Sequence, residues 1–272
     1  MFFQSSKQTR MGTRGIRIKS RRRRRLIPII VAVLLVIFAG ISTVWSLHPE
    51  YFQGRLNQSI VMAEAKRHPF VSEGKGKYLT NVDMPTWGEL GKLRKDDSGL
   101  RLRAYIAVPK LRIELPIYQG TTKYTLAMGA GTMKGKHDGI LNEADVLGAS
   151  NYALSGHNMA DYLTYFSPFQ RHIMGTSLEG FNIYVTDGKY VYKYKHTAKY
   201  IVNNDGEASE WIKNTKATDI NPVITLVTCF EQAPYWTHAR KRIIIRGDFL
   251  KKYDLNKQNA KKLFNISPDL VK

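Results

Sequence analysis

The chain has 272 residues, of which 43% are hydrophobic, so it can bury at least one sizeable core. Its formal net charge of +20 suggests a nucleic-acid partner at first sight. Half of that charge, however, comes from the ten basic residues of segment 1–25, which contains no acid. A surface that tracks a nucleic acid carries its charge on the folded part, so this distribution argues against DNA or RNA binding.

Directly after the basic segment, residues 26–47 read LIPIIVAVLLVIFAGISTVWSL, a run of 22 residues without a charge. As a helix it would be about 33 Å long, which matches the hydrocarbon core of a bilayer. The run is longer than the apolar region of a signal peptide, and no clean small-residue cleavage site follows it, so we expect an uncleaved anchor. Basic residues stay on the cytoplasmic side, which predicts a single-pass cell-membrane protein with residues 1–25 inside and the rest of the chain outside.

Residues 48–98 are polar and are expected to form a stalk and a helical lead-in, with a short helix near residues 57–67. From residue 99 to residue 250 the sequence changes to short strand-like runs separated by turn signals. The predicted strands cover residues 103–110, 112–120 and 151–157, a hairpin over 181–196 that turns at Asp187-Gly188, and residues 223–229 and 240–250. Many short strands with little helix predict an all-β barrel or sandwich.

Three further segments depart from this strand pattern. Residues 161–173 have apolar residues at helical spacing, but Pro168 is expected to interrupt a helix there. Residues 199–222 are predicted to form a long loop that could include a short helix. The basic C-terminal tail, residues 251–272, is expected to be helical or frayed and is too polar to span a membrane.

The chain has one cysteine, Cys229, at the end of the strand-like run VITLVTC. A lone thiol outside the cell is a buried apolar group, an intermolecular link or a reactive nucleophile. Strand alternation places Val227 and Cys229 on one face, and Arg242 and Ile244 on one face of the following strand. A thiol beside arginines has the surroundings that favour a thiolate, which makes the nucleophile hypothesis worth pursuing.

A cysteine nucleophile also needs a base, and the seven histidines are the candidates. Five of them lie in the predicted stalk, in a loop or in segments where a surface role is expected: His48, His68, His137, His172 and His196. His238 lies in the loop before the last strand, whereas His157 ends an apolar strand, where a side chain is held firmly yet stays accessible. The residues alone favour His157 without excluding His238.

Three segments of the chain together resemble the signature segments of sortases, the membrane-anchored cysteine transpeptidases of Gram-positive bacteria. These are TLVTC (225–229), the strand-ending SGH (155–157) and RIIIRG (242–247). The stretch from LPIYQG to LAMGAGTMKG (115–135) resembles the class A branch most closely. The resemblance covers roughly residues 100–250, and Ser155 departs from it because alanine is common at that position.

The resemblance implies an all-β fold, a closed β-barrel of about eight strands with short helices, preceded by one transmembrane helix. Residues 99–250 would be the catalytic domain, which cleaves LPxTG-type sorting signals of surface proteins between threonine and glycine. Cys229 would attack the threonine carbonyl and form a thioacyl-enzyme. His157 would protonate the leaving amine and then deprotonate the incoming amine, which lipid II, a cell-wall precursor, normally supplies.

The resemblance also implies roles for the residues around this pair. Arg242 would stabilise the oxyanion or hold the substrate backbone, a task that suits a permanently charged guanidinium with several donors; without the resemblance, a solvated strand charge is an equal interpretation. Thr228 would be a supporting donor. Val227, Ile244 and Ser155 would line the pocket for the leucine and proline of the signal, with plain packing as the alternative.

No metal or other cofactor is predicted. Some class A sortases bind calcium through acids in the loop before the histidine strand, where this chain has Glu143 and Asp145. Two acids at this spacing are the ordinary composition of an exposed loop, so they do not suffice for a metal site.

Two other functions compete with this one. The first is a pilin-polymerising or specialised sortase that uses a lysine amine; such enzymes often carry a lid over the groove and a C-terminal membrane segment, and the sequence indicates neither. The second is a non-catalytic, membrane-tethered β-barrel that binds wall polymer through its basic surface. Slow alkylation of Cys229 that does not depend on His157 would favour this last function.

Overall fold

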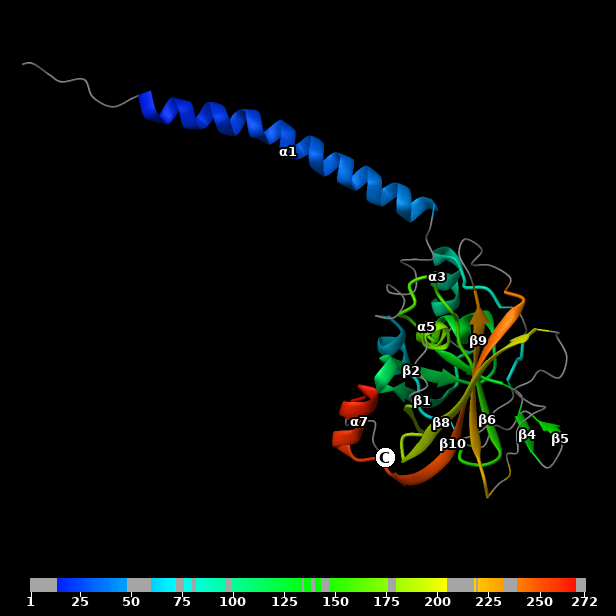
Figure 1. Cartoon of the computed structure of the whole chain (residues 1–272). Helices are drawn as coiled ribbons and strands as arrows, with labels where there is room; N and C mark the ends of the chain where they lie inside the picture. Colours follow the sequence, from blue (N-terminus) through cyan, green and yellow to red (C-terminus); the bar gives the residue numbers. More distant parts are fainter. Residues whose placement is uncertain are drawn as a thin grey trace, which may run out of the picture. The chain divides into compact units, whose positions relative to one another are not determined.

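The chain forms two compact units, Met1–Pro49 and Glu50–Lys272, in the computed structural model (Figure 1). Each unit is considered by itself. The structure describes residues 14–47, 60–71, 76–79, 82–95, 99–133, 135–137, 140–142, 147–175, 180–204, 218, 220–231 and 239–267.

The first unit contains one long helix, α1 (Arg14–Leu47). Its stretch Leu26–Val44 has a mean hydropathy of 2.8, and none of that stretch is buried inside the unit. A helix this long and apolar that has no protein partner for its side chains has the properties of a bilayer-spanning segment. The structure is therefore consistent with the predicted membrane anchor.

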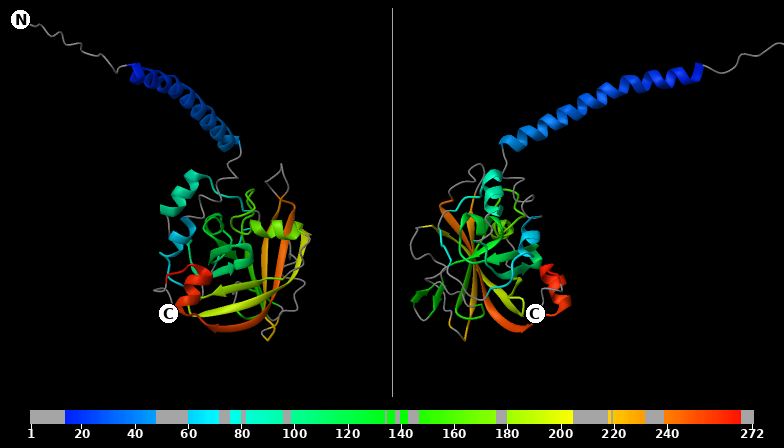
Figure 2. Two further views of the ribbon diagram at one scale, coloured as in Figure 1. Left: turned by 60° about the vertical axis from the view of Figure 1, so that its left-hand side comes forward. Right: turned by 180° about the vertical axis from the view of Figure 1, so that it is seen from behind.

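The second unit is a closed barrel whose strand order is β1-β2-β3-β6-β9-β10-β8-β7 (Figure 2). Its strands are β1 (Leu102–Val108), β2 (Ile113–Tyr118), β3 (Ala130–Thr132), β6 (Asn151–Ser155), β7 (Asn182–Thr186), β8 (Tyr190–Asn203), β9 (Val223–Phe230) and β10 (Lys241–Asp254). A separate hairpin pairs β4 (Gly135–His137) with β5 (Ile140–Asn142). The prediction of a closed all-β barrel of about eight strands with short helices is confirmed.

Short helices lie between and beside the strands. They are α3 (Trp87–Lys95), the 3-10 turn Pro109–Leu111, α4 (Lys123–Ala127), α5 (Ser167–Met174) and α7 (Lys257–Phe264). The turn at Pro109–Leu111 connects β1 to β2 and ends at Arg112, which has a left-handed backbone with φ of 56°. The two strands then pair antiparallel, from Val108 opposite Ile113 onward.

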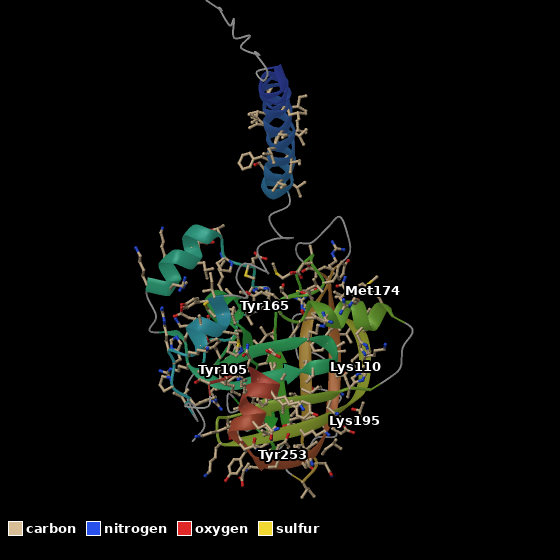
Figure 3. The ribbon with its side chains drawn as sticks, turned by 90° about the vertical axis from the view of Figure 1, so that its left-hand side faces the viewer. Tyr105, Lys110, Tyr165, Met174, Lys195 and Tyr253 are labelled. Atoms are coloured by element: carbon tan, nitrogen blue, oxygen red, sulfur yellow. The ribbon has the colours of Figure 1, made fainter. Side chains whose placement is uncertain are left out.

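Helix α5 packs against β9 and β10 and lies across the end of the barrel that carries the C-terminus of β9 (Figure 2). In Figure 3, Tyr165 marks the loop that leads into it and Met174 its last residue. Pro168 does not interrupt this helix as predicted, because it occupies the first turn, where a missing N–H costs nothing. Phe166 and Phe169 are fully buried in the barrel core, so the helix closes this end of the barrel.

Two regions outside the barrel pack against its core, which was not predicted. The short helix expected near residues 57–67 is present over residues 60–65, and its Val61 and Ala65 are fully buried in the core. In the C-terminal tail, α7 buries Phe264 completely, and the side chain of Asn256 caps the helix by accepting the N–H of Asn259. The strands also run further: β8 continues to Asn203, so the first part of the predicted 199–222 loop is strand.

Candidate active site

The strands β6, β9 and β10 lie side by side and set the geometry of the site. Ser155 of β6 pairs in parallel with Val227 of β9. Cys229 pairs antiparallel with Arg242 of β10. His157 follows Ser155 by two residues, and the next residue, Asn158, donates from its Nδ2 to the carbonyl of Cys229 at 2.9 Å. The segment that carries His157 and the strand that carries Arg242 therefore lie on either side of the Cys229 segment.

Cys229 and Arg242 form the non-hydrogen-bonded type of antiparallel pair, in which the two side chains are closer together. Gly156 donates its N–H to the carbonyl of Val227 at 3.1 Å, so the main-chain groups of Val227 point toward β6. The N–H and C=O groups of successive strand residues point to opposite sides. Those of Cys229, two residues after Val227, therefore also point toward β6 and away from β10. A pair of this type is not hydrogen-bonded, and its Cα atoms are about 4.5 Å apart with the side chains close together.

The pair lies on the outer face of the barrel wall. Leu226 precedes Val227 and Ile243 follows Arg242, and both side chains belong to the core cluster. Because successive residues of a strand point to opposite faces, Cys229 and Arg242 point away from that core. Below Cys229 and Arg242, Val227 pairs with Ile244, and these two side chains are 2% and 0% exposed although neither belongs to the core cluster. An apolar, covered row thus lies directly beneath the thiol, with the half-buried Ser155 beside it.

Cys229 is partly buried, with Arg242 and Glu231 beside its thiol. Burial raises the pKa of this thiol to about 11; the positive charge of Arg242 opposes that rise, and the carboxyl of Glu231 adds to it. At neutral pH the resting side chain is therefore the neutral thiol. Any nucleophilic role requires a base that removes its proton when substrate is bound.

His157 is also partly buried. Burial lowers the pKa of its imidazole to about 4, opposed by the charge of Asp83. The ring meets Tyr165 edge-on with centroids 6.0 Å apart, and the carbonyl of His157 accepts the N–H of Phe166 at 3.0 Å. Its Nε2 is buried and has no hydrogen-bond partner among the described residues. The resting imidazole is neutral, and no described residue engages that nitrogen.

Gly156 is needed for this arrangement. A Cβ built at this position would lie 2.6 Å from the ring of Phe166, closer than real side-chain contacts permit. Only glycine lets the chain pass against Phe166 between the end of β6 and His157. The glycine of the SGH segment therefore has a packing reason.

Arg242 is anchored through its guanidinium. The side chain is 9% exposed, and its Nη1 donates to the carbonyls of Ala239 at 2.7 Å and of Lys241 at 3.2 Å. These contacts hold a fixed positive charge next to Cys229. A preorganised donor of this kind is suited to stabilise negative charge that develops on a reacting carbonyl.

Glu231 is a third charged group at the site, and the sequence analysis missed it. Burial raises the pKa of its carboxyl to about 7; Arg242 and a hydrogen bond from the Cys229 thiol oppose that rise. The only available signal was its position two residues after the cysteine. A strand end that carries an acid is common, so this signal has little weight alone.

Asp83 is a second group that the sequence analysis missed. Its charge influences the pKa of His157, of Cys229 and of Glu231 together, so the exposed Asp83 lies close to all three. It belongs to the segment predicted as stalk and lead-in. That segment therefore reaches the site, which no pattern in the sequence predicted.

The hydroxyl of Thr228, which was predicted to be a supporting donor, has a hydrogen-bond partner within the protein. Its hydroxyl is buried and donates to the carbonyl of Gly156 at 2.7 Å, so its donor capacity is used within the protein. The bond joins β9 to the chain just before His157. Thr228 thus fixes the spacing between the histidine and cysteine segments instead of offering a donor to a ligand.

The remaining histidines and acids lie elsewhere. His68 is close to Glu64, and His172 and His196 both contact the ring of Phe181; His196 is buried, contrary to the predicted surface role. His48, His238, Glu143 and Asp145 lie outside the described residues, as do the side-chain surroundings of His137. Within the part that the structure describes, no cluster of three or more His, Cys, Asp or Glu side chains could hold a metal.

Comparison with known proteins identifies the family. The profile described as "Sortase domain" matches residues 106–249, which is more than half of the chain and contains Cys229, His157 and Arg242. The chain therefore belongs to the sortase family, whose members are cysteine transpeptidases.

Sortases A are among its similar relatives. The chain is 27% identical over 222 residues to Sortase A of Bacillus anthracis, a match that covers 81% of this chain and 93% of that protein. It is 32% identical over 159 residues to Sortase A of Listeria monocytogenes, covering 58% of this chain and 61% of that protein. The solved structure of Listeria monocytogenes sortase A is 30% identical and covers 61% of this chain and 99% of the solved one, with a TM-score of 0.49.

Proposed function

We propose that this protein is a membrane-anchored, class A-type sortase that cuts LPxTG-type sorting signals between threonine and glycine and joins the surface protein to the amine of lipid II. The observation that supports it best is the strand register. It pairs Cys229 with Arg242 on one side, and on the other side β9 lies beside β6, whose chain continues through Gly156 to His157. A thiol, an imidazole and a guanidinium can serve as nucleophile, acid–base group and oxyanion donor in acyl transfer through a thioester.

In the first half-reaction Cys229 is the nucleophile. As its sulfur bonds to the threonine carbonyl carbon, the thiol proton passes to the unengaged nitrogen of His157. Arg242 stabilises the oxyanion of the tetrahedral intermediate. When the intermediate collapses, the imidazolium gives its proton to the glycine nitrogen, the peptide bond breaks and a thioacyl-enzyme remains.

In the second half-reaction the amine of the cell-wall precursor attacks the thioester. His157, now neutral, takes the amine proton and returns it to the sulfur as the thiolate leaves. The products are the new amide and the starting thiol, so proton and electron balance close without a cofactor. Because both resting groups are neutral, the thiolate–imidazolium pair is a minor form, and substrate binding must help to form it.

The apolar row beneath the catalytic groups is the proposed site for the leucine and proline of the signal. Val227 and Ile244 supply the aliphatic surface, and Ser155 borders it. We further propose that residues 1–25 are cytoplasmic and the barrel is extracellular, where sorting signals and lipid II meet. The basic tail before α1 supports this orientation.

The experiment uses the full chain in detergent micelles, incubated with an LPxTG peptide and a glycine amine and followed by mass spectrometry. It is expected to give a thioacyl adduct on Cys229, the glycine leaving peptide and the joined product. Cys229→Ala is expected to give none of the three. Threonine–glycine cleavage that survives this substitution would contradict the proposal.

The acceptor is tested separately. A glycine amine that mimics a wall precursor and a lysine side-chain amine are supplied at equal concentration. Preferential joining to the glycine amine supports wall anchoring, whereas preferential joining to lysine would assign the enzyme to the pilin-polymerising type.

A further inference from the structure

The end of strand β9 is held on one side by side chains instead of by a neighbouring strand. Backbone bonding between β6 and β9 reaches the contact from Gly156 to the carbonyl of Val227. Two residues on, the Nδ2 of Asn158 donates to the carbonyl of Cys229 at 2.9 Å. Two residues further, Glu231 donates its N–H to the Oε1 of Gln170 at 2.9 Å, and its carbonyl accepts from the Nε2 of Gln170.

The two side-chain amides therefore continue the hydrogen-bond ladder after β6 has diverged. Val227, Cys229 and Glu231 point their main-chain groups to the same side, and successive partners are a backbone N–H, Asn158 and Gln170. The amides are also joined to one another, since Asn158 Nδ2 lies 2.5 Å from Gln170 Oε1. The result is one connected chain of contacts from α5 to the main chain on both sides of Phe230.

The orientation of both amides follows from their partners. Asn158 Nδ2 faces two oxygens, and Gln170 matches one donor and one acceptor of Glu231, so neither group can flip without losing contacts. All three residues are largely or fully buried, with Asn158 at 6%, Gln170 at 0% and Glu231 at 9% exposure. Their contacts are thus shielded from competition by water.

The arrangement also carries a cost in stability. The Oδ1 of Asn158 is buried and has no hydrogen-bond partner among the described residues. An unsatisfied buried acceptor lowers the stability of the fold, and an apolar side chain would avoid this cost. The Asn158 amide is therefore better explained by its N–H contacts to Cys229 and Gln170 than by a contribution to stability.

Helix α5 gives this chain of contacts a rigid base. Phe169, the residue before Gln170, is fully buried and packs against Phe166 and Phe181 with ring centroids 5.1 and 6.4 Å away. Pro168 lies in the first turn of the helix. Gln170 thus projects from an element that is fixed in the barrel core onto the main chain that carries the nucleophile.

We propose that Gln170, acting with Asn158, is a positioning residue that holds Cys229 in register with His157 and Arg242. The proposal rests on the proposed function. Without these contacts the last residues of β9 keep only the pairing to β10, and the sulfur can shift relative to the imidazole. A misplacement on the order of 1 Å can cost about 100-fold in rate, so the effect is expected on kcat more than on KM.

The test compares three variants of the full chain in detergent micelles. Gln170→Met keeps the volume but removes every contact, and is expected to lower kcat about 10- to 100-fold with KM changed by less than about threefold. Gln170→Glu keeps both acceptor contacts but loses the donor to the Glu231 carbonyl, so its kcat is expected to lie between those of Gln170→Met and wild type. Phe264→Leu, a core control in α7, which packs against β1 and β2, is expected to lower Tm by several degrees while kcat stays within about twofold of wild type.

The outcomes are distinct. Wild-type kcat in folded Gln170→Met, or an equal loss of kcat in Phe264→Leu at a similar fall in Tm, would overturn the proposal. If Gln170→Met does not fold, Asn158→Ala removes the contacts to the Cys229 carbonyl and to Gln170 while Gln170 keeps its contacts to Glu231, and it must show the same loss of kcat. The proposed function fails separately, namely if wild-type protein does not join the peptide to the amine at all.

Discussion

The two faces of the β9–β10 strand pair differ sharply in what they contain. The inner face consists of Ile224, Leu226, Ile243 and Ile245, all 0% exposed and part of one core. The outer face of the same strands carries the reactive row headed by Cys229. Successive residues of each strand point to opposite faces, and this alternation separates the two sets. The side chains that pack the core on the inner face are therefore different from those proposed to act in catalysis.

The outer face lowers the stability of the folded protein. The raised pKa values of Cys229 and Glu231 and the lowered pKa of His157 each record a group kept away from water. Burying an aliphatic side chain stabilises by about 1.5–3 kcal/mol, so the inner face offsets much of this cost. Stability and reactivity are therefore expected to respond to different substitutions.

The largest expected effect is on the reactive side. His157→Ala is expected to reduce kcat about 1,000-fold, because it removes the group that moves both protons. The check is the steady-state rate with LPxTG peptide, alongside a thermal melt to confirm folding. Activity within about tenfold of wild type would mean that another base, such as His238, acts on the thiol.

The next largest effect separates charge from geometry. Arg242→Lys is expected to lower kcat about 100-fold, because an ammonium keeps the charge but loses the planar set of donors. Arg246→Lys is the matched control on the same face, where Arg246 lies over the ring of Tyr200 and opposite Thr225. Equal losses in both variants would contradict a specific role for Arg242.

The inner face is tested by Leu226→Ala. It is expected to lower the free energy of unfolding by about 2–5 kcal/mol, because it leaves a cavity in the core. In the folded protein, kcat and the rate of Cys229 alkylation by iodoacetamide are expected to change by less than about twofold. A large change in either would show that the two faces are not independent.

The smallest effect concerns the pH dependence of stability. Glu231 has its pKa raised from 4.5 to about 7, so the native state holds a proton that the unfolded chain releases between these values, and stability falls as pH rises. Glu231→Gln removes this loss and is expected to stabilise the protein by about 1–2 kcal/mol at pH 8 and not measurably at pH 4.5. Chemical denaturation at the two pH values is the measurement. Equal effects at both would show that the carboxyl does not titrate as inferred.

Much of this division could be predicted from the sequence. Strand alternation predicted that Cys229 and Arg242 share a face, and the register pairs them directly. His157 was favoured because it ends an apolar strand, and that strand proved to be the neighbour of β9. These predictions depend on local periodicity, which the sequence displays openly.

The supporting residues could not be predicted in the same way. Asn158, Gln170 and Asp83 reach the site from a loop, a helix and the lead-in, through contacts that no periodicity encodes. The prediction that Pro168 interrupts a helix was wrong for a local reason. The apolar spacing that resembled a helix extends into a loop in which Tyr162 and Tyr165 have positive φ, and the helix begins only at Ser167.

The amides of Asn158 and Gln170 also affect how this barrel meets other polypeptides. An unpaired strand end normally attracts extended chains, which add to it as a further strand. At the end of β9 the accepting and donating groups are already occupied by side chains. A secreted protein with an extended tail therefore finds no edge to extend there, so recruitment at this point depends on fitting its side chains into pockets, and copies of the barrel gain no template for sheet-to-sheet association.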